Sequence, residues 1–226
     1  MNAHLIHVEA EAARENDELI KALTLIEEAL VAYQKEKDYE GFSQALQSRV
    51  LTYKHLFLLT KDHVFAILAK NDANASLEIT QKHNITTRIG SCYFRLGEVA
   101  MLFEDYKSAV ENYQKALDNY AGSNSERGDY RYHLGFALGK IGQLEKAKET
   151  MLNGLSEIQE NRNEVNSFLT HVWESGGYMR LAELLRQNEP EQAKKYLEEA
   201  RKIIKSDKKL IIRKRQIEEL EATFTS

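Results

Sequence analysis

Few side chains in this 226-residue chain have a spacing that could support catalysis or metal binding. His4 and His7 share one face of an expected helix, but two imidazoles are too few ligands for a zinc site. Acidic pairs such as Glu27-Glu28 are adjacent, so on a helix they point in different directions and cannot work together as acid and base. We therefore expect no enzyme activity, no metal and no cofactor.

The sequence also lacks the short motifs that mark common enzymes. It contains no GxGxxG or GxxxxGK[ST] phosphate loop, no HExxH pair and no GxSxG turn. Its single cysteine, Cys92, cannot form an internal disulfide and is interpreted as a small buried side chain rather than a nucleophile. One cysteine favours a reducing compartment, so we expect the protein to be cytoplasmic.

No segment of the sequence indicates a membrane or a signal peptide. The longest uncharged apolar runs are far too short to span a bilayer. The first residues carry Glu9 and Glu11 and lack a basic region, which argues against a signal peptide. We expect no membrane partner.

The elements that must position any functional residue are helices. The chain has one Pro and 11 Gly, and Ala, Leu, Glu, Lys and Gln dominate, which favours helix over strand. The segment 91–120 holds two helical patterns joined by a short acidic turn, with Leu96-Gly97 twelve residues before Ala109. The same offset joins Leu134-Gly135 to Ala147, shifted by 38 residues.

This recurring pattern resembles the tetratricopeptide repeat, a helix–turn–helix unit of about 34 residues. The resemblance implies an all-α, right-handed α-solenoid of about five helix pairs plus a C-terminal capping helix. It also implies one domain over 1–226. The expected units are 3–36, 39–83, 85–120, 126–161 and 164–205, with the cap at 207–224.

Several residues have predicted roles within these units. Gly97 lacks a side chain, so we expect the two helices of its repeat to cross closely there. Asp105 and Asp17 are expected to cap the helices that follow them. Near 190, the sequence Asn188-Glu189-Pro190-Glu191 predicts a capped helix start with proline in the first turn.

The last segment is predicted to cover the end of the array. Leu210, Ile217, Leu220 and Phe224 form an apolar stripe suited to that role. Because Ile211 and Ile212 lie off this stripe, we expect them to be exposed and to allow a homodimer through the C-terminal helix.

The same end of the chain is basic. Residues 194–215 contain ten basic and three acidic side chains, although the whole chain has a net charge of −4. The charges alternate with apolar positions, and the stretch lacks the aromatic interleaving of a base-stacking platform, since Tyr196 is its one aromatic residue. We interpret this stretch as the solvated face of amphipathic helices and consider nucleic acid an unlikely partner.

The resemblance also predicts a binding surface, because the first helix of each repeat lines the concave face in this family. The corresponding positions are unusually apolar. The expected peptide-binding residues are Phe94, Glu98, Met101, Tyr132, His133, Phe136 and Tyr178. Aromatic side chains in a groove are suitable anchors for a peptide. The alternative is that long helices fold over the groove and these side chains pack together.

A specialised form of this groove is excluded by the residues present. The family's carboxylate clamp uses Lys and Asn at positions that Phe94, Glu98, Tyr132 and Phe136 occupy here. We therefore expect a non-catalytic scaffold that binds a peptide or protein segment by other contacts. The alternatives are a peptide-sensing regulator, for which we expect an additional N-terminal effector domain that this sequence does not show, or a structural self-association module.

Overall fold

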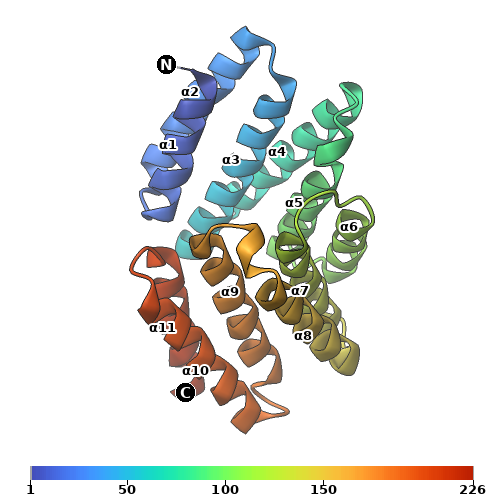
Figure 1. Ribbon diagram of the computed structural model, residues 1–226, viewed down its shortest axis with the longest axis vertical. Helices are drawn as coiled ribbons and strands as arrows, with labels where there is room; N and C mark the ends of the chain where they lie inside the picture. Colours follow the sequence, from blue (N-terminus) through green and yellow to red (C-terminus); the bar gives the residue numbers. More distant parts are fainter. Residues whose placement is uncertain (1, 226) are drawn as a thin grey trace. The chain divides into compact units, whose positions relative to one another are not determined.

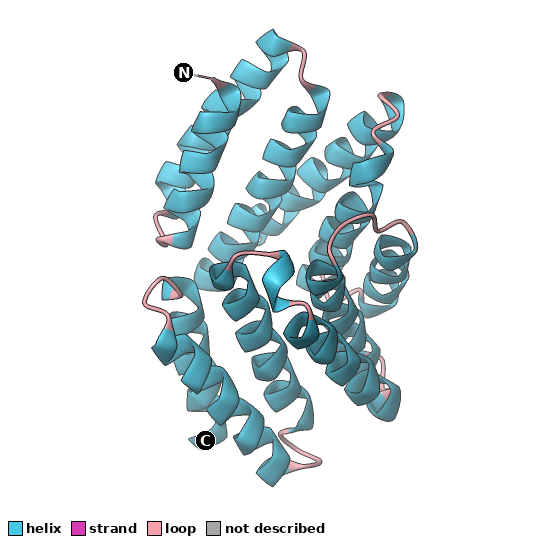
Figure 2. Cartoon of the chain, viewed as in Figure 1, coloured by secondary structure: helices cyan, strands magenta, loops and turns pink. Residues whose placement is uncertain are grey.

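The computed structural model describes residues 2–225, and helices make up its regular structure. In this range there are eleven α-helices, two short 3₁₀ helices and no strand (Figure 2). The expected all-α fold is confirmed. The helices are α1 (Ala3–Glu15), α2 (Leu19–Glu36), α3 (Tyr39–Thr60), α4 (His63–Lys82), η1 (Thr86–Arg88), α5 (Ile89–Leu102), α6 (Tyr106–Asp118), α7 (Asn124–Lys140), α8 (Leu144–Glu160), η2 (Arg162–Glu164), α9 (Ser167–Leu185), α10 (Pro190–Ser206) and α11 (Ile211–Thr225).

The helices divide into two compact units. Unit 1 ends at Ala121 and contains α1 to α6, and unit 2 begins at Gly122 and contains α7 to α11. Within unit 1 the first helices α1, α3 and α5 contact one another in order, while α2 and α4 each contact the first helix of the next pair (Figure 1). In unit 2, α7 pairs with α8 and contacts α9, which pairs with α10. That all five pairs form one continuous domain stays a prediction.

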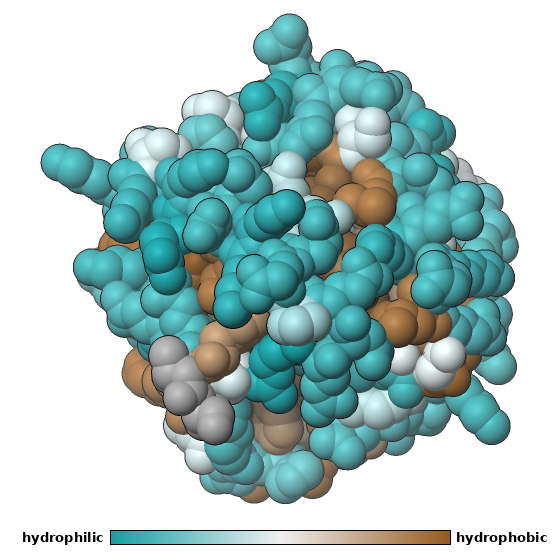
Figure 3. All heavy atoms as spheres, turned by 90° about the horizontal axis from the view of Figure 1, so that it is seen from below, coloured by the Kyte–Doolittle hydropathy of each residue, from teal (hydrophilic) through white to brown (hydrophobic). Residues whose placement is uncertain are grey.

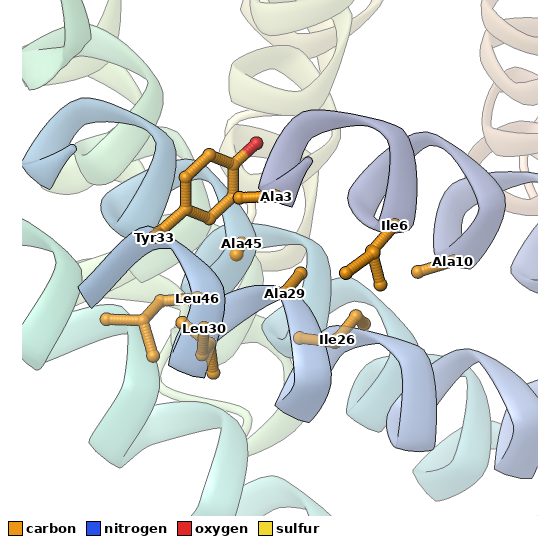
Figure 4. Close-up of a cluster of buried hydrophobic side chains, with 9 residues drawn as sticks. All are labelled: Ala3, Ile6, Ala10, Ile26, Ala29, Leu30, Tyr33, Ala45 and Leu46. Atoms are coloured by element: carbon orange, nitrogen blue, oxygen red, sulfur yellow. The ribbon is translucent and has the colours of Figure 1, made fainter. Parts of the chain in front are cut away.

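Small side chains let the helices of unit 1 approach closely. The core at its start joins three helices around fully buried alanines and one tyrosine (Figure 4). Its members are Ala3, Ile6, Ala10, Ile26, Ala29, Leu30, Tyr33, Ala45 and Leu46. On α1 and α2 they recur at spacings of three and four residues, so each helix presents one apolar stripe to its neighbours.

The crossing of α5 and α6 depends on Gly97. A Cβ atom added there would lie 2.6 Å from the Tyr113 ring, well inside van der Waals contact. The Asp105 side chain caps α6 by accepting a hydrogen bond from the backbone N–H of Ser108 at 3.2 Å. The predicted close crossing and the predicted cap are both confirmed.

Two other predicted caps are wrong. Asp17 has a left-handed backbone with φ of 62°, so it turns the chain between α1 and α2, and Glu18 takes the cap position instead. The cap of α10 is Glu189, whose side chain makes no capping hydrogen bond. Pro190 does occupy the first turn of α10, as predicted.

Cys92 is buried, as expected, but its surroundings are polar. Its Sγ lies 3.3 Å from Ser76 Oγ and 3.4 Å from Thr80 Oγ1, and the Gln47 amide donates to it at 3.4 Å. Ser43 Oγ joins the two hydroxyls at 2.8 Å each. These residues come from α3, α4 and α5, so a hydrogen-bonded cluster ties three helices together where an apolar core was expected.

At the end of unit 2, α11 covers α9 and α10. Leu210 and Ile217 are buried in a cluster with residues of both helices, and Leu220 and Phe224 pack against it. The expectation that both isoleucines are exposed is wrong, since Ile211 is 42% exposed but Ile212 only 5%. The expected stripe was counted from Leu210 as a helical residue. Residues 207–210 form a turn instead, so the position of Leu210 does not indicate which face of α11 carries Ile212.

Candidate binding surfaces on the first helices

The first helices α5, α7 and α9 carry the predicted binding residues, and most of these side chains are covered. On α5, Phe94 is 4% exposed, and its ring centre lies 5.4 Å from that of Tyr113. The Arg95 guanidinium lies 5.4 Å from the centre of the Phe94 ring. Aromatic and cationic neighbours therefore pack against this ring.

Glu98 is the centre of a charged cluster rather than an open acid. Its carboxylate is 4% exposed and accepts hydrogen bonds from Lys54 of α3 and Arg95. A buried carboxylate needs such cationic partners because burial removes its hydration. Met101, one turn further along α5, is half-buried.

On α7 of unit 2, Tyr132 packs between helices. It is 1% exposed and lies against Gly176 and Gly177 of α9, and a Cβ atom on Gly176 would lie 2.8 Å from the Tyr132 hydroxyl. Burial, reinforced by Asp129, raises the pKa of Tyr132 well above its usual value, so the hydroxyl stays protonated. The glycine pair gives the ring its space.

His133 continues this packed layer. Its ring stacks on Tyr132 with centres 4.3 Å apart, and its Nδ1 lies 2.9 Å from the backbone carbonyl oxygen of Asp129. The Nδ1–H tautomer donates this hydrogen bond. The His133 side chain is 15% exposed, so only part of the ring reaches the surface.

Phe136 lies beneath two basic side chains. It is 3% exposed, with the Arg180 guanidinium 4.4 Å and the Lys140 ammonium 4.9 Å from its ring centre. Glu183 accepts from Lys140 at 2.9 Å and from Arg180 at 3.1 Å. Burial acts to raise the pKa of Glu183, but the two cations outweigh it and lower the pKa overall. A partner at this point would meet charged groups before the ring.

Tyr178 of α9 contacts α8 and α10. Its hydroxyl accepts from the Gln159 amide of α8 at 2.9 Å, and its ring stacks on Tyr196 of α10 with centres 6.0 Å apart. The structure therefore brings together Tyr132, His133 and Phe136 in unit 2, but not Tyr178.

The seven predicted residues thus divide by exposure. Phe94, Glu98, Tyr132 and Phe136 are buried, which is what the packing alternative describes, and the other three are half-buried. Their role in binding stays a prediction. Sequence reasoning missed the cations over the rings, although the four-residue spacing of Phe136 and Lys140 could have indicated one of them.

One of these helix pairs matches a known family model. The model described as tetratricopeptide repeat matches residues 90–121, which span α5 and α6. This segment of the chain is a tetratricopeptide repeat. Among curated proteins, no sequence matches it significantly.

Solved structures with a similar fold are also found. BtubC (BKLC) from P. vanneervenii is similar with a TM-score of 0.63 and 15% identity, covering 89% of this chain and 79% of that one. A putative kinesin light chain with TPR-like repeats from Podosopora anserina has a TM-score of 0.57 and 15% identity. The match covers 90% of this chain and 96% of that one. A single-substitution variant of that light chain has a TM-score of 0.58 and 16% identity. The match covers 89% of this chain and 93% of that one. These similarities show the tetratricopeptide-repeat-like solenoid fold.

Among the described residues, none of the helices combines the length and apolarity needed to cross a membrane.

Proposed function

We propose that this chain is a non-catalytic scaffold that binds a peptide or protein segment on the first helices of its repeats. The observation that carries the proposal is the tetratricopeptide repeat at α5 and α6. Repeats of this family stack helix pairs to present an extended surface for protein partners. The similar fold of two structures named as putative kinesin light chains supports the same architecture.

The described surfaces favour a partner with mixed polar and apolar character. Met101 on α5 and His133 on α7 are half-buried and offer limited apolar contact. Around Phe136, Lys140 and Arg180 provide cations above a buried ring. Such a surface is expected to recognise a segment through charge and hydrogen bonding around a few apolar contacts.

The test begins with affinity capture of partners from native lysate and identification by mass spectrometry. A captured protein is then purified, and its affinity for the wild-type chain is measured by calorimetry. We expect Met101→Asp and His133→Ala to weaken binding about ten-fold or more if these residues lie in the contact.

Leu152 provides the matched control. It lies on α8, a second helix, and is 36% exposed. Leu152→Asp should leave the affinity unchanged. If Leu152→Asp abolishes binding while the first-helix variants bind normally, the partner uses the second helices and the proposed surface is wrong.

Self-association is a second candidate, because Ile211 at the start of α11 is 42% exposed. We propose that two copies meet there through Ile211 without Ile212, which is buried. Light scattering at high protein concentration tests this. A mass near 26 kDa for the wild type would exclude the dimer, whereas a dimer that Ile211→Glu dissociates would support it.

A further inference from the structure

Unit 2 contains a cavity that the binding surfaces described above do not use. It has a volume of about 590 Å³ and lies among η2, the first turns of α9 and the last turns of α10. This volume is in the range of pockets that hold small organic molecules. Its wall combines charged side chains, Arg162, His171, Glu174 and Lys202, with the apolar side chains of Val165 and Ile203.

Arg162 is held in a fixed orientation at this cavity. Its Nε and Nη2 donate to the two carboxylate oxygens of Glu174 at 2.6 and 2.7 Å. Glu174 is 1% exposed, whereas the Arg162 side chain is 56% exposed. The hydrogen bond to Glu174 raises the pKa of Arg162, and the bidentate pair leaves both N–H groups of Nη1 for another acceptor.

Two further nitrogen groups line the same cavity from other helices. His171 of α9 donates through Nδ1–H to the Asp207 carboxylate at 2.9 Å, so its Nε2 on the other side of the ring donates to an anion only in the doubly protonated imidazolium form. Lys202 of α10 pairs with Glu199 at 2.6 Å, but this pair is solvent-exposed and can exchange readily for another anion. The cavity therefore has guanidinium, imidazole and ammonium groups on three separate elements.

The chemistry of these groups favours one kind of ligand. Groups on three elements can each donate to a different oxygen of one ligand. A phosphate monoester has three terminal oxygens, whereas a carboxylate has only two. Arginine forks and lysine ammonium groups are the usual protein ligands of phosphate. Each of the three groups also faces a carboxylate, Glu174, Asp207 or Glu199, so a bound phosphate shares Arg162 and His171 with their partners and displaces Glu199 from Lys202.

We propose that this cavity binds a small phosphorylated molecule, with its phosphate on Arg162, His171 and Lys202 and its organic part against Val165 and Ile203. This site is independent of the protein-binding surface proposed above. Neither a partner protein nor self-association is needed for it to be occupied.

Isothermal titration calorimetry on the full chain tests the proposal with inorganic phosphate, O-phosphoserine and acetate. We expect saturable binding of both phosphates and tighter binding of O-phosphoserine, with acetate much weaker. Arg162→Lys keeps the charge next to Glu174 but loses the fork, and Lys202→Gln removes the ammonium. Each should weaken phosphate binding about ten-fold or more.

Lys195→Gln is the matched control, because Lys195 is exposed on the same helix as Lys202 but does not line the cavity. Its affinity should equal that of the wild type, and thermal melting should show that all variants are folded. Equal losses for Lys195→Gln and Lys202→Gln would overturn the site in favour of diffuse surface charge. So would acetate binding as tightly as phosphate, or no saturation by about 10 mM phosphate.

Vesicles containing phosphatidic acid test whether the bound phosphate monoester belongs to a lipid headgroup rather than to a soluble molecule. Binding to vesicles with no binding of the soluble phosphates would overturn the small-molecule assignment. Soluble binding that vesicles do not compete away would support it.

Discussion

At the scale of single residues, His7 shows how polar side chains are placed inside unit 1. It is 6% exposed, with Nε2 2.8 Å from Ser48 Oγ and Nδ1 3.4 Å from the Tyr33 hydroxyl. Ser48 in turn donates to Glu11 at 3.2 Å. A consistent set of donors has Tyr33 donating to Nδ1 and Nε2–H donating to Ser48, which requires a neutral imidazole.

This environment predicts a pH dependence of stability. Burial is the main cause that lowers the pKa of His7 below 6.5, with Glu11 opposing it and Arg14 and His4 adding to it. The unfolded chain therefore binds a proton more readily than the folded one. The contribution to stability is fully present well above pH 6.5 and is lost as the pH falls through 6.5 towards the lower folded pKa.

The measurement is the midpoint of urea unfolding at several pH values between about 7.5 and about 5, which cover the ordinary range of histidine titration. His7→Gln should be less stable at the upper end and should lose part of the wild-type pH dependence. His63→Gln, at an exposed histidine of α4, should behave like the wild type. An unchanged slope in His7→Gln would show that other groups control this dependence.

Gly97 gives the second prediction at this scale. Its missing side chain leaves space for the Tyr113 ring, so Gly97→Leu should destabilise the fold by about 1–3 kcal/mol through overpacking. Denaturant unfolding measures the change, and Lys107→Leu on the exposed side of α6 is the control. A Gly97→Leu variant as stable as the wild type would mean that α5 and α6 can separate without cost.

At the scale of elements, α11 completes the core of unit 2. Leu210 and Ile217 are buried against α9 and α10, and Phe224 packs on the same cluster. Without α11 these apolar surfaces would meet water, and arrays of this kind need a terminal element that covers them.

We therefore predict that deleting 207–226 yields an aggregating or unfolded chain. Size-exclusion chromatography and circular dichroism of the truncated protein are the measurements. The double variant Lys208→Ser with Lys209→Ser, which changes only exposed residues of the preceding turn, should stay soluble and helical. A stable, soluble truncated chain would show that α11 is not a cap.

The sequence predicts the helices and their pairing better than it predicts individual side-chain contacts. The spacing from Gly97 to Ala109 predicts a helix pair because helix crossings need small residues at fixed positions. It does not predict that Arg162 reaches the carboxylate of Glu174, because that contact depends on the path of the η2 turn. Nor does it predict the burial of Phe94 and Phe136, which is completed by the side chains of Arg95, the next residue of α5, and of Arg180 on α9.

At the scale of the whole molecule, charge decides which partners are plausible. The net charge is −4, and several cations of the basic C-terminal stretch are already paired. Lys194 contacts Glu191 and Arg201 contacts Glu221. Figure 3 shows one face on which hydrophilic side chains predominate and the apolar ones appear as separate small areas.

We predict that this chain does not bind duplex DNA or RNA at about 200 mM salt, because paired and scattered cations lose nucleic acid steeply as salt rises. Electrophoretic mobility shifts across a salt series are the measurement. The proposed phosphate site of unit 2 holds one group and offers no track for a polymer backbone. A shifted band that persists at high salt would contradict this prediction.

The buried thiol of Cys92 has a practical consequence. It is the only cysteine in the sequence and lies among hydroxyls contributed by α3 and α4. A thiol reagent can reach the sulfur only when these helices separate from α5, so the labelling rate reports how often unit 1 opens. The rate of Cys92 modification, followed by mass spectrometry, therefore measures local unfolding at one site without an engineered label.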